Sequence, residues 1–291
     1  MKPAAFEYHA PRTTEEAVQL LSELGDEAKL LAGGQSLVPM LSLRLAFFEH
    51  LVDVGRIEGL AGIERRGDQL WVGAGTIDAV LEASAEAAEA VPLLARALPL
   101  IGHFQIRSRG TVGGSIAHAD PAAELPAVAL ALDATLEAVS QRGRREIPAA
   151  DFFEGPWASC LEPDELLTGV SFPVWGGRSG FAVRELARRH CDPAIAGVAM
   201  GVQLDGGDRI ARAAIGLIGL GSTPVRARAA EAELAGRKPD EVEAAELGRL
   251  AVADLEELTS DLHGSADYRR RVGAAMVARA WTAASEEARG V

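Results

Sequence analysis

Hydrophobic residues over the first 55 positions follow two different spacings. Between residues 17 and 24 they recur at the helical interval, behind a capping-box pattern at Thr13–Glu16. Short apolar runs at 29–32 and 51–54 have the length and composition of strands. Residues 1–55 are therefore predicted to form a small β-α-β unit.

The middle of the chain mixes the two patterns. A helical pattern covers 77–90, and Pro92 opens a second one that runs to about residue 98. An extended pattern precedes these helices at 70–75, and others follow them at 135–140, 145–148 and 166–172. Together with the first unit, this part predicts one N-terminal domain over 1–175, with subdomains of about 1–55 and 56–175.

The pattern changes after Trp175–Gly180, which has the composition of a linker. Three extended segments come first and three helical ones, rich in Ala, Glu, Leu and Arg, come last. The extended segments are 181–186, 196–204 and 210–220, and the helical ones are 225–236, 240–259 and 264–286. Strands followed by helices predict a separate α+β domain over 178–291.

Composition excludes several classes of function. A net charge of −13 is opposite to the basic surface that nucleic-acid binding requires. The two cysteines, Cys160 and Cys191, are too few to ligate an iron–sulfur cluster and are expected to be inert thiols. The six histidines show no metal-ligand spacing, so no metal is expected. No apolar run is long enough for a membrane span and no signal peptide is evident, so a cytoplasmic location is expected.

Two glycine pairs are the main candidates for ligand binding. Gly33 and Gly34 end an apolar strand, and a second pair lies in Thr111–Ser115, flanked by hydroxyls. Glycines let a backbone approach a charged ligand, and consecutive N–H groups can cradle phosphate oxygens. Gly33–Gly34 alone could equally be a tight turn. Neither a GxGxxG nor a P-loop sequence is present, so we expect the two loops together to hold a phosphate-bearing ligand.

Other polar residues allow more than one interpretation. His118 and Asp120 lie near no recognisable nucleophile, so they are expected to position a ligand or the loop rather than to form a catalytic pair. Glu124 could accept a hydrogen bond from a ribose hydroxyl or be a solvated carboxylate. The charged stretch 184–192 could be a solvated surface, the edge of a ligand site or a partner interface.

Three motifs resemble one family along the whole chain. AGGQSLVPML, IRSRGTVGGSIAHADPAAELP and RELARRHCDPAIAGVAM are similar to the FAD-binding medium subunit of molybdenum hydroxylases, which includes carbon monoxide, nicotine, caffeine and heterocycle dehydrogenases. The resemblance implies an α+β fold: a two-subdomain FAD-binding domain of the PCMH type, then a carbon-monoxide-dehydrogenase flavoprotein C-terminal domain. It also implies an oxidoreductase with FAD as cofactor.

The resemblance further implies a set of cofactor-binding residues and no catalytic or metal-binding ones. The first loop would bind the FAD diphosphate with Ala32, Gly33, Gly34, Gln35, Ser36 and Leu37. Further contacts would come from the second loop and two residues beyond it, namely Thr111, Gly114, Ser115, Ala117 and Glu124. The apolar residues Ile101 and Leu167 would lie near the flavin, and the acidic residues Glu185 and Asp192 would lie close to the isoalloxazine.

One departure concerns the residue after Asp192. The family has an aromatic residue near the flavin ring where this chain has Pro193. Proline cannot stack in the same way, so access to the ring is expected to differ, which argues against carbon monoxide dehydrogenase itself.

The partners that the resemblance implies are a molybdopterin-binding large subunit and a [2Fe–2S] small subunit, in a dimer of heterotrimers. The chain would pass electrons from the clusters to a quinone, NAD or oxygen. Two alternatives are a self-sufficient FAD oxidoreductase of the same fold and a non-enzymatic flavin-binding scaffold.

Overall fold

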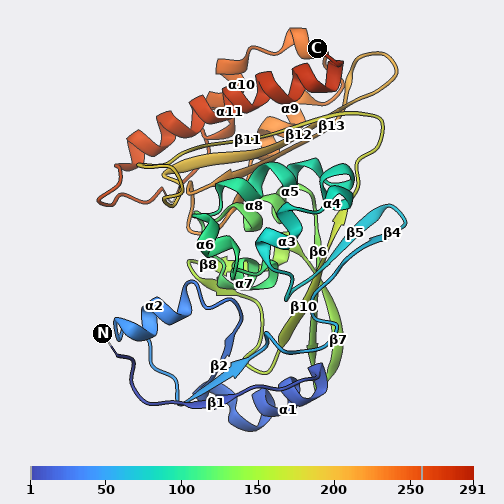
Figure 1. Ribbon diagram of the computed structural model, residues 1–291. Coiled ribbons are helices and arrows are strands. Elements are labelled where there is room, and N and C mark those ends of the chain that lie inside the picture. Colours follow the sequence, from blue (N-terminus) through green and yellow to red (C-terminus); the bar gives the residue numbers. More distant parts are fainter. Residues whose placement is uncertain (1, 257) are drawn as a thin grey trace.

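The computed structural model describes residues 2–256 and 258–291, and its N-terminal unit is a small parallel sheet with order β1–β3–β2 (Figure 1). The elements are β1 Glu7–His9, α1 Thr14–Leu24, η1 Gly25–Glu27, β2 Ala28–Leu31, α2 Leu37–Ser42 and β3 His50–Asp53. The Thr13 hydroxyl caps α1 by accepting from the Glu16 N–H at 3.2 Å, while the Glu16 carboxylate accepts from the N–H of Arg12 at 2.8 Å. The predicted β-α-β unit is confirmed.

The middle unit is a five-stranded antiparallel sheet, order β4–β5–β10–β6–β7, with a group of short helices. Its strands are β4 Ile63–Arg66, β5 Gln69–Gly73, β6 Thr135–Ser140, β7 Gly143–Pro148 and β10 Leu166–Pro173, with a separate pair β8 Phe153–Gly155 and β9 Ala158–Ser159. Its helices are α3 Asp78–Glu82, α4 Ala85–Ala90, α5 Pro92–Ala97, η2 Leu98–Leu100, α6 Phe104–Arg107, α7 Val112–His118, α8 Glu124–Ala131 and η3 Ala149–Asp151.

The single helix predicted over 77–90 is wrong, because the chain breaks it into α3 and α4. Ser84 lies at the break in an extended conformation, and its hydroxyl accepts from the Ala87 N–H at 3.1 Å. Serine at this position begins a new helix by satisfying an otherwise unpaired N–H group.

The C-terminal unit is a four-stranded antiparallel sheet, order β11–β12–β13–β14, with helices on its outer face (Figure 1). The strands are β11 Arg178–Leu186, β12 Ala196–Leu204, β13 Ile210–Ile218 and β14 Val225–Arg226, and the helices are α9 Arg228–Leu234, η4 Pro239–Glu241, α10 Ala244–Ala251 and α11 Ala266–Arg289. Two predicted helices are shorter than expected: β14 takes the start of one, and Pro239 begins a separate turn before the other. Residue 257, within predicted helix 240–259, lies outside the described residues.

Both faces of the C-terminal sheet are buried. Ala182 and Met200 point into a hydrophobic cluster with α10 and α11, whereas Phe181, Val183 and Ala199 point into the cluster of the middle unit. Helices α5 and α8 of the middle unit contact β11, β12 and β13 on this inner side. This accounts for the nearly continuous apolar sequence of β12, which lacks the alternation of a half-exposed strand.

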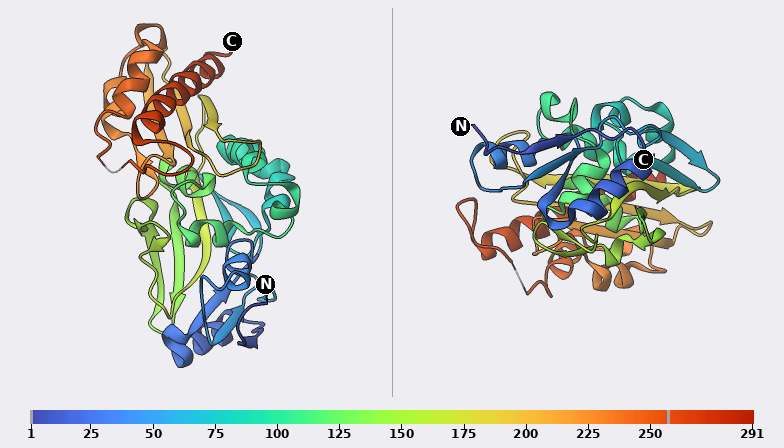
Figure 2. Two further views of the ribbon diagram at one scale, coloured as in Figure 1. Left: turned by 90° about the vertical axis from the view of Figure 1, so that its left-hand side faces the viewer. Right: turned by 90° about the horizontal axis from the view of Figure 1, so that it is seen from below.

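The three units follow one another along the molecule. Figure 2 shows α1 and the α10–α11 pair at opposite ends, with the middle unit between them. Within the described residues, no helix combines the length and the hydrophobicity that crossing a membrane requires.

Candidate functional site

The two glycine loops lie in direct contact, although they are far apart in the sequence. A Cβ atom on Gly33 would lie 2.1 Å from the Arg109 carbonyl oxygen and 2.8 Å from the Gly110 Cα. A Cβ atom on Gly114 would lie 3.3 Å from the Ala32 Cβ. The structure thus brings together the loops that the sequence paired, and it shows that close packing of the two backbones requires glycine at position 33.

The first loop presents a row of free backbone donors. Within the described part of the chain, the N–H groups of Gly33, Gly34, Gln35 and Ser36 donate to no protein acceptor. Gly34 has a φ of +73°, and the Gln35 side-chain amide donates to the Gly33 carbonyl at 2.8 Å. Consecutive unpaired N–H groups in a turn create a positive concavity that suits anionic oxygens.

The second loop is used differently. Thr111 caps α7, because its hydroxyl oxygen accepts from the Gly114 N–H at 3.0 Å. The Gly113 N–H donates to the Ala74 carbonyl at 2.8 Å and the Ser115 N–H to the Thr111 carbonyl at 2.9 Å. Because the protein already occupies these backbone donors, this loop can offer a ligand mainly hydroxyl hydrogens, those of Thr111 and Ser115.

Two of the expected acidic residues affect each other electrostatically, and Glu124 is buried while Glu185 is half-buried. Glu124, at the start of α8, is only 7% exposed, which excludes the solvated alternative. Burial, with the neighbouring Glu185 carboxylate second, raises the pKa of Glu124 to about 8. Burial also raises the pKa of Glu185, on β11, to about 7, and its buried Oε2 has no protein partner among the described residues. At neutral pH the Glu124 carboxyl is therefore mostly protonated and can donate a hydrogen bond, whereas Glu185 is close to its midpoint.

A third buried carboxyl, Asp78, was not identified from the sequence. It begins α3, is 2% exposed, and lies so close under the second loop that a Cβ on Gly110 would lie 2.3 Å from its Oδ2. Burial raises its pKa to about 7 against the opposing charge of Arg107, and its Oδ1 has no partner within the described residues. An acidic residue in a first helical turn is ordinary, so no local signal marked it.

The remaining expected residues are more dispersed. Leu167 is buried on β10, whereas Ile101 and Ala117 are half-buried, after η2 and in α7. Asp192 lies in the turn before β12, half-buried, and the described residues give its carboxylate no hydrogen bond that ties it to the loops.

Of the pair His118 and Asp120, Asp120 acts on the loop itself, one of the two roles expected for them. The Asp120 carboxylate accepts from the Ala122 N–H at 2.9 Å and so fixes the turn before α8. Burial lowers the pKa of His118 despite the opposing effect of Asp120.

The buried carboxyls predict a pH-dependent stability. The folded-state pKa of Glu124 lies above its ordinary value of 4.5, so folding favours the protonated form. Below pH 4.5 the carboxyl is protonated in both the folded and the unfolded state, so its burial carries no ionisation cost. The free energy of unfolding then falls as pH rises from 4.5 toward about 8. Since one pKa unit corresponds to about 1.4 kcal/mol, Glu124→Gln should be more stable than the parent by about 4 kcal/mol at pH 8 and nearly equal to it at pH 4. Melting curves against pH measure this, and parallel curves would contradict it.

These features fit FAD. The unpaired N–H groups of the first loop suit a diphosphate. The buried, partnerless oxygen of Glu185 suits a polar group of a large ligand.

Comparison with known proteins agrees with the geometry. Residues 4–175 match the family model described as the FAD binding domain in molybdopterin dehydrogenase, and residues 181–284 match the CO dehydrogenase flavoprotein C-terminal domain. The chain is 42% identical to subunit alpha of the 6-hydroxypseudooxynicotine dehydrogenase complex of Paenarthrobacter nicotinovorans, covering 99% of this chain and 97% of that one. It is 39% identical to the carbon monoxide dehydrogenase medium chain of Hydrogenophaga pseudoflava, covering 98% of each.

Solved structures give the same result. Carbon monoxide dehydrogenase from Hydrogenophaga pseudoflava superposes with a TM-score of 0.94 at 40% identity, covering 99% of both chains. Quinoline 2-oxidoreductase from Pseudomonas putida 86 superposes with a TM-score of 0.93 at 35% identity, also covering 99% of both. The resemblance and fold class inferred from the motifs are confirmed. The chain belongs to the family of FAD-binding domains of molybdopterin dehydrogenases, an oxidoreductase family, and its cofactor is FAD.

Proposed function

We propose that this chain is the electron-transfer subunit of a molybdenum-dependent dehydrogenase complex. The observation that carries the proposal is the row of unpaired N–H groups at Gly33–Ser36, held against the second loop. When bound there, FAD supplies the redox chemistry, taking electrons from a partner's [2Fe–2S] clusters and giving them to an external acceptor. The protein itself binds and orients the cofactor.

The proposed binding residues divide by the group that they suit. The backbone of Ala32–Leu37 would hold the diphosphate, with the hydroxyls of Thr111 and Ser115 as further donors. Glu124 would hydrogen-bond a hydroxyl, Ile101 and Leu167 would supply apolar contact, and Glu185 and Asp192 would lie nearest the ring. Gly114 and Ala117, in α7, complete the set. No side chain is required as a catalytic acid or base.

The proposed partners follow from what this chain lacks and from its relatives. Its two cysteines cannot ligate a cluster, so the clusters belong to a second subunit. The relative from Paenarthrobacter nicotinovorans is a subunit of a dehydrogenase complex, and the one from Hydrogenophaga pseudoflava is a medium chain. We therefore propose a molybdopterin-binding large subunit and a [2Fe–2S] small subunit, in a dimer of heterotrimers in the cytoplasm.

We also propose the domain division 1–175 and 178–291, with subdomains of about 1–55 and 56–175. The separate sheets of these segments support it.

The proposal is tested by spectroscopy of the flavin. The FAD-loaded chain alone should keep its oxidised spectrum when nicotine, caffeine, quinoline, carbon monoxide or an aldehyde is added. Co-expressed partner subunits should allow rapid bleaching by the substrate of the complex. Bleaching of the isolated chain by a small molecule would instead support the self-sufficient oxidoreductase, and a chain that takes up FAD but restores no turnover to the partners would support the scaffold.

An exposed apolar segment is the proposed contact with the iron–sulfur subunit. Large hydrophobic side chains are exposed along α2 and the loop after it, directly following the first glycine loop: Val38, Met40, Leu43, Leu45 and Phe47. Exposed apolar clusters of this kind mark interaction surfaces. The electron donor must approach the cofactor, so a cluster beside the cofactor loop suits the subunit that carries the [2Fe–2S] groups.

Charge introduced into this segment should weaken assembly. We expect Leu45→Glu or Phe47→Glu to reduce association with the small subunit about tenfold or more, with FAD content unchanged, as measured by co-purification and titration of the separate subunits. The matched control is Leu262→Glu, since Leu262 is also an exposed apolar residue but lies just before α11. Equal effects of Leu45→Glu and Leu262→Glu would contradict this interface.

A further inference from the structure

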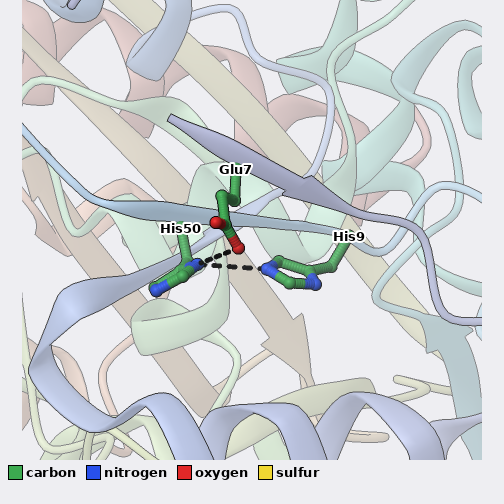
Figure 3. A group of neighbouring side chains, drawn as sticks. All are labelled: Glu7, His9 and His50. Atoms are coloured by element: carbon green, nitrogen blue, oxygen red, sulfur yellow. Dashed lines mark hydrogen bonds and ion pairs between the residues drawn. The ribbon is translucent and has the colours of Figure 1, made fainter. Parts of the chain in front are cut away.

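Two histidines and a glutamate converge on the N-terminal sheet, away from the glycine loops. Glu7 and His9 are two residues apart on β1, so their side chains share one face of the sheet. His50 begins β3 and pairs directly with Glu7 in the parallel register. Figure 3 shows the three side chains pointing toward one another from the two strands.

The distances in this cluster match those between ligands of one metal ion. His9 Nε2 lies 3.2 Å from His50 Nδ1, and Glu7 Oε2 lies 3.5 Å from the same His50 nitrogen. All three candidate ligand atoms lie within 4.8 Å of one another. With zinc–ligand bonds of about 2.0–2.1 Å, the edge of a tetrahedron is about 3.3 Å. The two short separations lie on either side of that value.

We propose that Glu7, His9 and His50 form a binding site for a divalent transition metal ion of the zinc type. His9 Nε2, His50 Nδ1 and a Glu7 carboxylate oxygen are its three protein ligands, and water completes the tetrahedron. The side chain of Glu7 is 75% exposed, which leaves an open route for the ion and the water, whereas that of His50 is only 15% exposed. The ion fastens the first strand of the chain to the central strand of its sheet.

A second acidic group nearby is a weaker candidate. Glu27 and Glu49 also approach His50. That group has one imidazole and two exposed carboxylates, and carboxylate-rich sites suit magnesium or calcium rather than zinc. Two imidazoles favour the first group, and the shared His50 makes the two arrangements alternatives that substitution can separate.

No spacing of residues in the sequence indicated this site. Metal motifs are recognised by ligands at short, regular spacing, such as two histidines on one helical face. Here Glu7 and His9 are joined by His50 from a strand that the parallel pairing places beside them, 41 residues after His9. The expectation of no metal rested on spacing alone.

The test is zinc titration of the full-length chain after removal of metals with EDTA. Calorimetry near neutral pH should show one zinc ion bound per chain, and cobalt substituted for zinc should give the visible absorption of a tetrahedral site. His9→Ala and His50→Ala should abolish both signals. Glu7→Gln, a change at an exposed side chain that leaves folding intact, should weaken binding at least about tenfold. FAD content and circular dichroism report whether each variant is folded.

Glu49→Gln is the matched control, because Glu49 is also an exposed carboxylate and lies next to His50 in the sequence. It should bind zinc like the parent chain. The proposal is overturned if the parent takes up no stoichiometric zinc, which would leave the cluster as a histidine–histidine hydrogen bond beside an ion pair. It is also overturned if Glu7→Gln binds as tightly as the parent, or if Glu49→Gln weakens binding as much as Glu7→Gln does.

Discussion

Replacing Gly33 by alanine should yield a chain that purifies with almost no flavin. The added Cβ would lie 2.1 Å from the Arg109 carbonyl oxygen and 2.8 Å from the Gly110 Cα. Both are backbone atoms, so relief requires the two loops to separate, which moves the free N–H groups out of position. Forced packing of this kind costs about 3 kcal/mol, equivalent to a loss of about 100-fold in FAD affinity.

The ratio of flavin to protein absorbance measures the effect, and a titration of the flavin-free chain with FAD gives the affinity. Gly206→Ala is the matched control, because a Cβ there meets nothing within 4 Å and its φ is not positive. A Gly33→Ala chain with stoichiometric flavin would show that the loops do not hold the cofactor. The sequence explained Gly33 by the close approach of a charged ligand, whereas the structure shows that a Cβ there would also clash with the second loop.

Replacing Arg269 by methionine should lower the free energy of unfolding by about 3 kcal/mol. Arg269, on α11, is 5% exposed, and its guanidinium donates to the Ile195 and Gly219 carbonyls and to the Asp261 carboxylate, the last at 2.7 Å. Methionine fills a similar volume but leaves these acceptors unpaired. The loss should also loosen the attachment of α11 to the segment that leads into β12.

Urea unfolding measures the difference, and its pH dependence tests the cause. The hydrogen bond from Arg269 lowers the pKa of Asp261, so the stabilisation is complete above the ordinary pKa of an aspartate and is lost as pH falls through the lower folded value. The difference in the free energy of unfolding between parent and variant should therefore become smaller at acid pH. Arg271→Met is the control, since Arg271 is exposed on the same helix and makes no side-chain hydrogen bond or ion pair with the described residues. A gap of the same size for both variants would rule out the buried contacts as the cause.

Local signals were sufficient for many elements of the fold. The Thr13 cap and Gly25 define α1, and the short apolar run before Gly33 forms β2, because in each case the responsible contact lies within a few residues. The same reasoning failed over 77–90, where a serine hydroxyl competed with the helix and divided it. A helical period alone does not distinguish one helix from two joined by a cap.

The site was predictable where the backbone itself makes it. Glycine pairs can be seen in a sequence, and the structure places both pairs in contact. The burial of Glu124, Glu185 and Asp78 could not be predicted, because the three residues lie on different elements, α8, β11 and α3, and their burial depends on parts of the chain that are distant in the sequence. The convergence of His9 and His50 has the same origin, since it depends on the register of two strands.

The two-sided burial of the C-terminal sheet bears on how members of this family can be recombined. A chimera joined in the 174–177 connection would take the sheet from one parent and the core that covers its inner face from the other, because Phe181, Val183 and Ala199 pack into the core of the N-terminal part. Exchange of the C-terminal part between relatives should therefore succeed only when α5 and α8 are exchanged with it. In evolution, the same dependence would make the two parts of the chain accumulate compensating substitutions along this seam rather than diverge independently.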